Sequence, residues 1–234
     1  MDPYRSTVAT QPASFTASGA LSINKVLRNT YLLLSATLLF SAAMAGLAML
    51  VGLPYGAGLI CSLVSLGLLW FVVPRTANSV NGIYAVFAVT GLLGLGLGPV
   101  LNMYLSAFGN GGQIVMTAFG LTGGIFVGLS AYAVKSGRDF SFMRGFLIGG
   151  ILIAFGLAIV SLVASLMGFA MQPLALAVSA MFAVLMCGMI LYETGDIVNG
   201  GQTNYILATI SLYVAIYNLF TSLLHLLGFA AGEE

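Results

Sequence analysis

The chain has 234 residues, of which 60% are hydrophobic and only 6% charged, and its mean hydropathy is +1.08. An ordinary soluble domain carries about 25% charged residues, so this composition excludes that class and indicates a protein that crosses a membrane repeatedly. The net charge of +1 gives no reason to expect nucleic acid as a partner.

Seven long apolar runs follow one another along the chain. They cover residues 26–51, 56–73, 80–105, 113–134, 145–167, 174–193 and 204–230. A helix needs about 20 residues to cross a hydrocarbon core, and lipid cannot satisfy backbone polar groups in other open structures. We therefore predict an all-α polytopic membrane protein. A flexible cytoplasmic N-terminal tail is expected at residues 1–24, and one seven-helix transmembrane domain at residues 25–234.

The basic residues predict how the chain is oriented. Lysine and arginine precede the first run, follow the second and separate the fourth from the fifth: Arg5, Lys25, Arg28, Arg75, Lys135, Arg138 and Arg144. The gaps at residues 53–55, 107–113 and 168–172 contain none. Because cytoplasmic loops are enriched in basic residues, we expect a cytoplasmic N-terminus. Seven spans then place the C-terminus on the opposite side of the membrane.

The last run carries a stripe of small and polar residues at alternating steps of four and three. Its members are Asn204, Ala208, Ser211, Ala215, Asn218, Ser222 and His225. This spacing puts them on one face of a helix. Lipid would reject such a face, so we expect the seventh helix to lie centrally in the bundle. Two interpretations remain open, namely close packing with hydrogen bonds between helices, or a solvated path for ions or protons.

Two acidic residues, Glu193 and Asp196, lie at the end of the sixth run and share a helical face. A carboxylate near membrane depth usually marks a pathway or a paired group, and two neighbouring carboxylates make a site sensitive to pH. The alternative is that both are solvated at the cytoplasmic interface. With Ser211 and Asn218 of the stripe, these acids form the candidate proton or ion site.

Enzyme chemistry has little support in the sequence. The single histidine, His225, and two distant cysteines, Cys61 and Cys187, cannot form a zinc site. We expect neither catalysis nor a cofactor. Calcium prefers 6–8 oxygen ligands, so two carboxylates indicate at most transient coordination.

GxxxG spacing occurs at Gly124–Gly128 and at Gly145–Gly149. The pattern indicates either dimerisation or close packing between helices of the same bundle.

Several segments of the chain carry a family resemblance. They are Lys25–Tyr31, Ala131–Ala133, Gly137–Phe142 with the loop residues Arg138 and Asp139, Leu191–Asp196, Gly200–Tyr205 and Leu212–Phe220. Together they resemble the Bax inhibitor-1 family (transmembrane BAX inhibitor motif proteins), and in particular its bacterial YccA-like branch. The resemblance extends from about Lys25 to Phe229.

This resemblance implies seven helices with the last one central, a bacterial inner (plasma) membrane location, and two candidate activities. YccA-like members bind and restrain the FtsH-type ATP-dependent membrane protease, which is the function we expect here. Other members leak calcium in a pH-dependent way through a pair of aspartates. Glu193 stands at the first acid position of that pair, whereas Ala215 stands at the second. The two-acid latch therefore cannot form as the family has it, and Asp196 is a candidate substitute.

Overall fold

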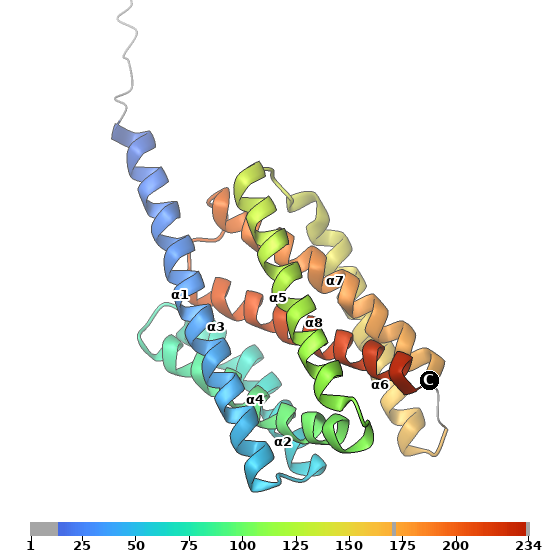
Figure 1. The fold of residues 1–234 in the computed structure, drawn as a ribbon. Helices are drawn as coiled ribbons and strands as arrows, with labels where there is room; N and C mark the ends of the chain where they lie inside the picture. The colour runs from blue at the N-terminus through green and yellow to red at the C-terminus, as the bar shows by residue number, and fades with distance from the viewer. Residues whose placement is uncertain (1–13, 170–171, 233–234) are drawn as a thin grey trace, which may run out of the picture.

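The computed structural model describes residues 14–169 and 172–232, and it is built from helices joined by short connections (Figure 1). The helices are α1 (Ser14–Val51), α2 (Tyr55–Phe71), α3 (Val73–Thr76), α4 (Asn81–Ala107), α5 (Gly111–Ser136), η1 (Ser141–Met143), α6 (Arg144–Leu166), α7 (Gln172–Val198) and α8 (Tyr205–Gly232). The described residues contain no β-strand, which confirms the all-α prediction.

Six helices of the described ranges are long and apolar enough to cross a membrane: α1 from Ile23 onward, α4, α5, α6 with η1, α7 and α8. The second apolar run, expected as a span over residues 56–73, instead gives a helix of 17 residues. Helix α2 stops at Phe71 because Pro74 follows, and a proline has no N–H to donate to the preceding turn. The chain then continues as the short α3.

Helix α1 begins at Ser14, inside the segment that we expected to be a tail. Residues 1–13 of that predicted tail, and Glu233 and Glu234 at the other end, lie outside the described residues.

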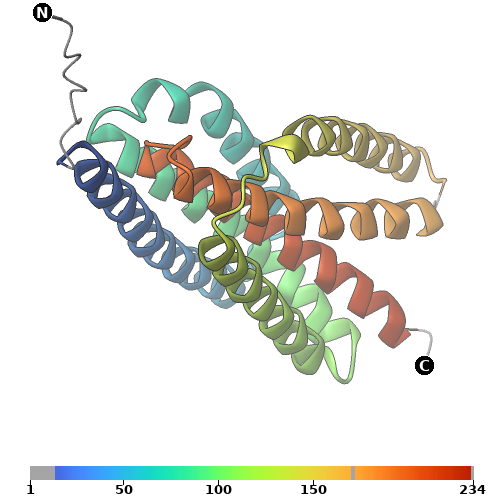
Figure 2. The ribbon, with the colours of Figure 1, turned by 90° about the horizontal axis from the view of Figure 1, so that it is seen from above.

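Helix α8 contacts α1, α4, α5 and α7 (Figures 1 and 2). Opposite faces of α8 are both buried, with Ala208 and Leu212 on one side and Ile206 and Tyr213 on the other. Within the small and polar stripe, every residue is buried or half-buried. A helix enclosed in this way requires small side chains wherever a neighbour approaches closely, which explains the composition of the stripe.

Glycines of α4 allow α1 and α2 to approach its backbone. A Cβ atom at Gly94 would overlap the backbone carbonyl oxygen of Ser41 in α1, and one at Gly98 would meet the Cβ of Ala48 at 2.5 Å. On another face, a Cβ at Gly96 would lie 3.0 Å from the carbonyl oxygen of Gly58 in α2. The glycine-rich stretch before Pro99 is therefore a packing surface for two helices.

The glycines of the GxxxG pairs behave differently, because they lie outside the packed interior. A Cβ atom at Gly124, Gly128, Gly145 or Gly149 would meet no atom within 4 Å. Packing within the bundle, one of the two interpretations of this spacing, is therefore wrong for the described part of the chain. Gly120 is equally open, so that Gly120, Gly124 and Gly128 form an outward-facing α5 glycine stripe.

Helix α6 lies at the edge of the bundle beside α7 (Figure 2), and α7 is the long helix against which it mainly packs. Its outer face consists of exposed apolar side chains such as Leu152, Ile153 and Val160. This helix therefore presents most of its surface to the surrounding membrane.

Candidate functional site

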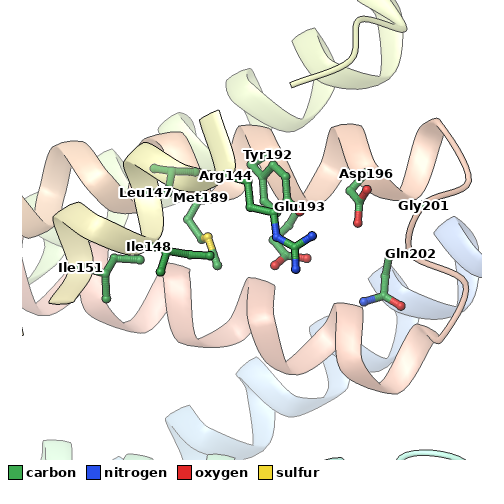
Figure 3. A pocket seen from close by; sticks show the side chains of 10 residues that line it. All are labelled: Arg144, Leu147, Ile148, Ile151, Met189, Tyr192, Glu193, Asp196, Gly201 and Gln202. Atoms are coloured by element: carbon green, nitrogen blue, oxygen red, sulfur yellow. The ribbon is translucent and has the colours of Figure 1, made fainter. Parts of the chain in front are cut away.

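A cavity of about 550 Å³ lies between the first turns of α6, the last turns of α7 and the connection from α7 to α8 (Figure 3). It is lined by Arg144, Leu147, Ile148, Ile151, Met189, Tyr192, Glu193, Asp196, Gly201 and Gln202. Its volume lies within the range of about 300–1,000 Å³ that is typical of small-molecule sites. Both acids of the sequence-predicted site thus line one cavity.

Glu193 is almost enclosed, with 7% of its surface exposed. Ser211 of α8 lies near its carboxyl group. Arg144, the first residue of α6, lines the same cavity (Figure 3). A buried carboxyl group is costly unless polar groups accompany it, and Ser211 and Arg144 are polar side chains near Glu193.

The end of α7 is shaped by two glycines. Gly200 has a φ of +76°, a backbone conformation that glycine adopts without strain, and it ends the helix. The N–H of Gly201 then donates to the backbone carbonyl of Asp196 at 2.9 Å. A Cβ atom at Gly201 would overlap the carboxyl group of Asp196. The Gly-Gly pair therefore keeps Asp196 at the mouth of the cavity, where it is half-buried.

The loop that contains Arg138 and Asp139 is held by local hydrogen bonds. The Asp139 carboxylate accepts from the backbone N–H of Ser141 at 2.8 Å and from its hydroxyl at 2.9 Å. These two donors lower the pKa of the Asp139 carboxyl group. The amide of Asn199, just after α7, donates to the carbonyl of Arg138 at 3.0 Å. The loop motif thus ties the start of α6 to the end of α7.

A close approach across the same loop reinforces this tie. A Cβ atom at Gly195 of α7 would meet the ring of Phe140 at 2.6 Å, so a glycine is needed there. Phe140 itself is buried. Arg144, which lines the cavity, follows four residues later, so this contact lies beside the start of α6.

The four residues of the predicted proton or ion site are not all brought together. Ser211 meets Glu193, and Asp196 lines the same cavity. Asn218 lies seven residues beyond Ser211 on α8, about 10 Å along the axis at 1.5 Å per residue. Its amide donates to the Val214 carbonyl of its own helix at 2.8 Å. Ala215, which the sequence resemblance places at the second acid position, is 1% exposed.

Tyr213 is a residue whose role the sequence did not indicate. Its hydroxyl shares a 2.6 Å hydrogen bond with the hydroxyl of Ser41 in α1 and donates to the carbonyl of Thr90 in α4 at 3.3 Å. It therefore joins three helices inside the bundle.

Nearer the C-terminal end of α8, His225 Nδ1 and the hydroxyl of Ser179 lie 2.6 Å apart. This distance agrees with the expectation that His225 is a hydrogen-bonding residue.

Asn204 fixes the start of α8 and ties it to the segment after α3. Its side-chain oxygen accepts from the N–H groups of Ile206 at 2.9 Å and Leu207 at 3.3 Å. Its amide nitrogen donates to the Ala77 carbonyl at 3.0 Å and to Asn78 Oδ1 at 2.9 Å.

Replacement of Asn204 with alanine is expected to lower the free energy of unfolding by about 1–2 kcal/mol, because a helix cap and a bond between segments are lost together. The control is Asn110→Ala, since Asn110 precedes α5 without a capping hydrogen bond from its side chain. Unfolding in detergent micelles measures both. Equal stability of the two variants would contradict the role given to Asn204.

The geometry of the described residues gives no support for a metal-binding site. These residues contain no group of three or more His, Cys, Asp or Glu side chains placed to hold one ion.

The helices, their apolar outer faces and the cavity near one end define a multi-pass α-helical membrane protein. The model of the family described as inhibitor of apoptosis-promoting Bax1 matches residues 23–232. The chain therefore belongs to the Bax inhibitor-1 family.

Several curated bacterial relatives are similar over nearly their full length. An uncharacterized membrane protein of Vibrio cholerae is 46% identical over 92% of this chain and 93% of its own. The Escherichia coli K12 protein named modulator of FtsH protease YccA is 45% identical over 94% of this chain and 97% of its own. In another Escherichia coli strain the relative is named inner membrane protein YccA. These names describe modulators and membrane proteins, and they support an inner-membrane location for this chain.

Proposed function

We propose that this protein binds an FtsH-type membrane protease and slows its action on other substrates. The observation that carries the proposal is the 45% identity, over 94% of the chain, to a relative named as a modulator of that protease. An ATP-dependent protease that extracts membrane proteins must pull on its substrates. A bundle whose helices approach as closely as α1 and α4 do would resist such pulling.

The finer architecture belongs to the same proposal. Helix α2, continued by α3, serves as a seventh spanning segment, and α8 is the centre of the bundle. The N-terminus is cytoplasmic, with residues 1–24 as an extension on that side, and the C-terminus lies opposite. Support comes from the basic residues that flank the spans. It comes also from the contacts of α8 with four neighbouring helices.

The α5 glycine stripe is the proposed docking surface for helices of the protease. Membrane helices associate through small residues that let two backbones approach, and these glycines meet no other part of the described chain. The neighbouring outward-facing residues Met116 and Val127 are exposed as well, at 69% and 63%. A partner helix could therefore approach the backbone of α5 along these glycines.

Affinity purification from native bacterial membranes in mild detergent tests the interaction. The protease should be retained with this protein and absent from a parallel purification of an unrelated multi-pass protein. Failure to retain it under conditions in which both proteins remain folded would count against the proposal.

A second candidate function is a pH-sensitive cation leak, with transient calcium or protons as its ligands. It is favoured by one observation, the almost enclosed Glu193 carboxyl group beside Ser211 at a cavity. Ionisable groups at membrane depth commonly mark ion pathways. Calcium flux into liposomes at several pH values distinguishes the two functions. Flux that depends on pH and is reduced by Glu193→Gln supports the leak, whereas flux equal to that of empty liposomes rejects it.

A further inference from the structure

The cavity beside Glu193 is polar at one end and apolar at the other. Figure 3 shows Arg144, Glu193, Asp196 and Gln202 gathered toward the connection between α7 and α8. The aliphatic side chains of Leu147, Ile148, Ile151 and Met189 lie on the other side, farther along α6 and α7. The polarity therefore changes along the direction of the spans, as it does along a membrane lipid.

The depth of the cavity matches that of lipid headgroups. Glu193 precedes the end of α7 at Val198 by five residues, which corresponds to about 7.5 Å along a helix. The headgroup region of a bilayer is about 5–7 Å thick on each side. Arg144, the first residue of α6, lies at the same end of the bundle. The charged groups are thus level with headgroups, and the aliphatic groups are level with the first carbons of acyl chains.

The charges of the lining indicate a zwitterionic ligand. One guanidinium group and two carboxyl groups line the same cavity, so a purely anionic ligand would meet Glu193 and Asp196 unfavourably. The described residues do not bring a third His, Cys, Asp or Glu side chain to the two carboxyl groups, as a bare metal ion would require. A ligand with both a phosphate and an ammonium group satisfies both signs.

The chemistry of the lining further selects a primary ammonium group. Carboxylates accept hydrogen bonds, and a primary ammonium offers three N–H donors where a quaternary ammonium offers none. Quaternary ammonium groups are instead recognised by cages of aromatic rings. Tyr192 supplies the aromatic ring of this lining, and one ring does not form a cage.

We infer that this cavity binds the headgroup of a phosphatidylethanolamine molecule. The phosphate lies against the guanidinium of Arg144 and the amide of Gln202, and the ammonium lies against the Asp196 and Glu193 carboxyl groups. An acyl chain follows Ile148 and Ile151 along α6, where Ile148 is 51% exposed to the membrane. This inference depends on the cavity alone and is independent of the protease.

Native mass spectrometry of the purified full-length protein tests the inference. The protein is incubated with equal amounts of phosphatidylethanolamine, phosphatidylglycerol and phosphatidylcholine that carry the same acyl chains. We expect the ethanolamine lipid to be retained about tenfold better than the other two, since charge-assisted hydrogen bonds are worth about one such factor or more. Arg144→Gln and Asp196→Asn should each remove most of this preference.

Arg138→Gln is the matched control, because Arg138 lies in the same loop region and does not line the cavity. It should retain the parent preference. Thermal unfolding in lipid-free detergent establishes that each variant is folded, and Arg144→Lys, which keeps the charge, should retain part of the preference. Equal retention of the three lipids by the parent would overturn the inference. So would a preference for phosphatidylglycerol, or a preference that survives Arg144→Gln.

Discussion

Replacement of Gly94 with leucine is expected to cost about 3 kcal/mol or more in the free energy of unfolding, the upper end of the penalty for overpacking a core. The first atom of the new side chain would already overlap the backbone of Ser41, which cannot move aside as a flexible side chain can. Ser41 also holds the Tyr213 hydroxyl at 2.6 Å, so separation of α1 from α4 would break that hydrogen bond as well.

The matched control for this prediction is Gly124→Leu, which makes the same chemical change where a Cβ atom meets nothing within 4 Å. It should leave stability unchanged or raise it by up to about 1 kcal/mol, because glycine is a poor helix former. Denaturant titration of the proteins in mixed micelles measures both variants. A Gly94→Leu protein as stable as the parent would show that α1 and α4 do not pack as described.

The double variant Gly124→Leu, Gly128→Leu is expected to reduce co-purification of the protease about tenfold or more. Two leucine side chains would hold a partner helix away from the α5 glycine stripe, because membrane helices associate through small residues that let their backbones approach. The readout is the amount of protease retained per molecule of folded protein, determined after size-exclusion chromatography.

Gly156→Leu serves as the control for the docking surface. A Cβ atom at Gly156 would also meet no atom within 4 Å, but Gly156 lies on α6 and not on the α5 glycine stripe. This variant should retain the protease as the parent does. If both variants lose the protease equally, the loss reflects general enlargement of the surface and the docking site is wrongly placed. If neither loses it, the protease binds elsewhere.

The helices themselves were predictable because lipid imposes a simple rule on sequence. Long apolar runs gave the position of every long helix, and the residues of the stripe from Asn204 to His225 are buried or half-buried, as their small and polar character indicated. The length of α2 was predicted less well. The effect of Pro74 on the preceding turn shortens a run that hydrophobicity alone extends to residue 73.

The site was only partly predictable, since it depends on contacts between distant segments. Glu193 and Ser211 were grouped in advance as members of one candidate ion site, because a carboxylate near membrane depth and a polar helix stripe both indicate a pathway. Asn218 was grouped with them by sharing a face, although a shared face includes positions two turns apart. Arg144 was recognised as a marker of orientation, and its place over the cavity follows from the contacts of Phe140 and Asn199. No local pattern encodes those contacts.

The central claim, that this protein restrains an FtsH-type protease, is tested most directly by the rate at which that protease degrades a membrane-protein substrate. Vesicles containing protease and substrate are compared with and without this protein, at equal protease concentration and saturating ATP. The account predicts slower loss of substrate when the parent protein is present, and a weaker effect with Gly124→Leu, Gly128→Leu. A rate of substrate loss that is unchanged by the parent protein would contradict it.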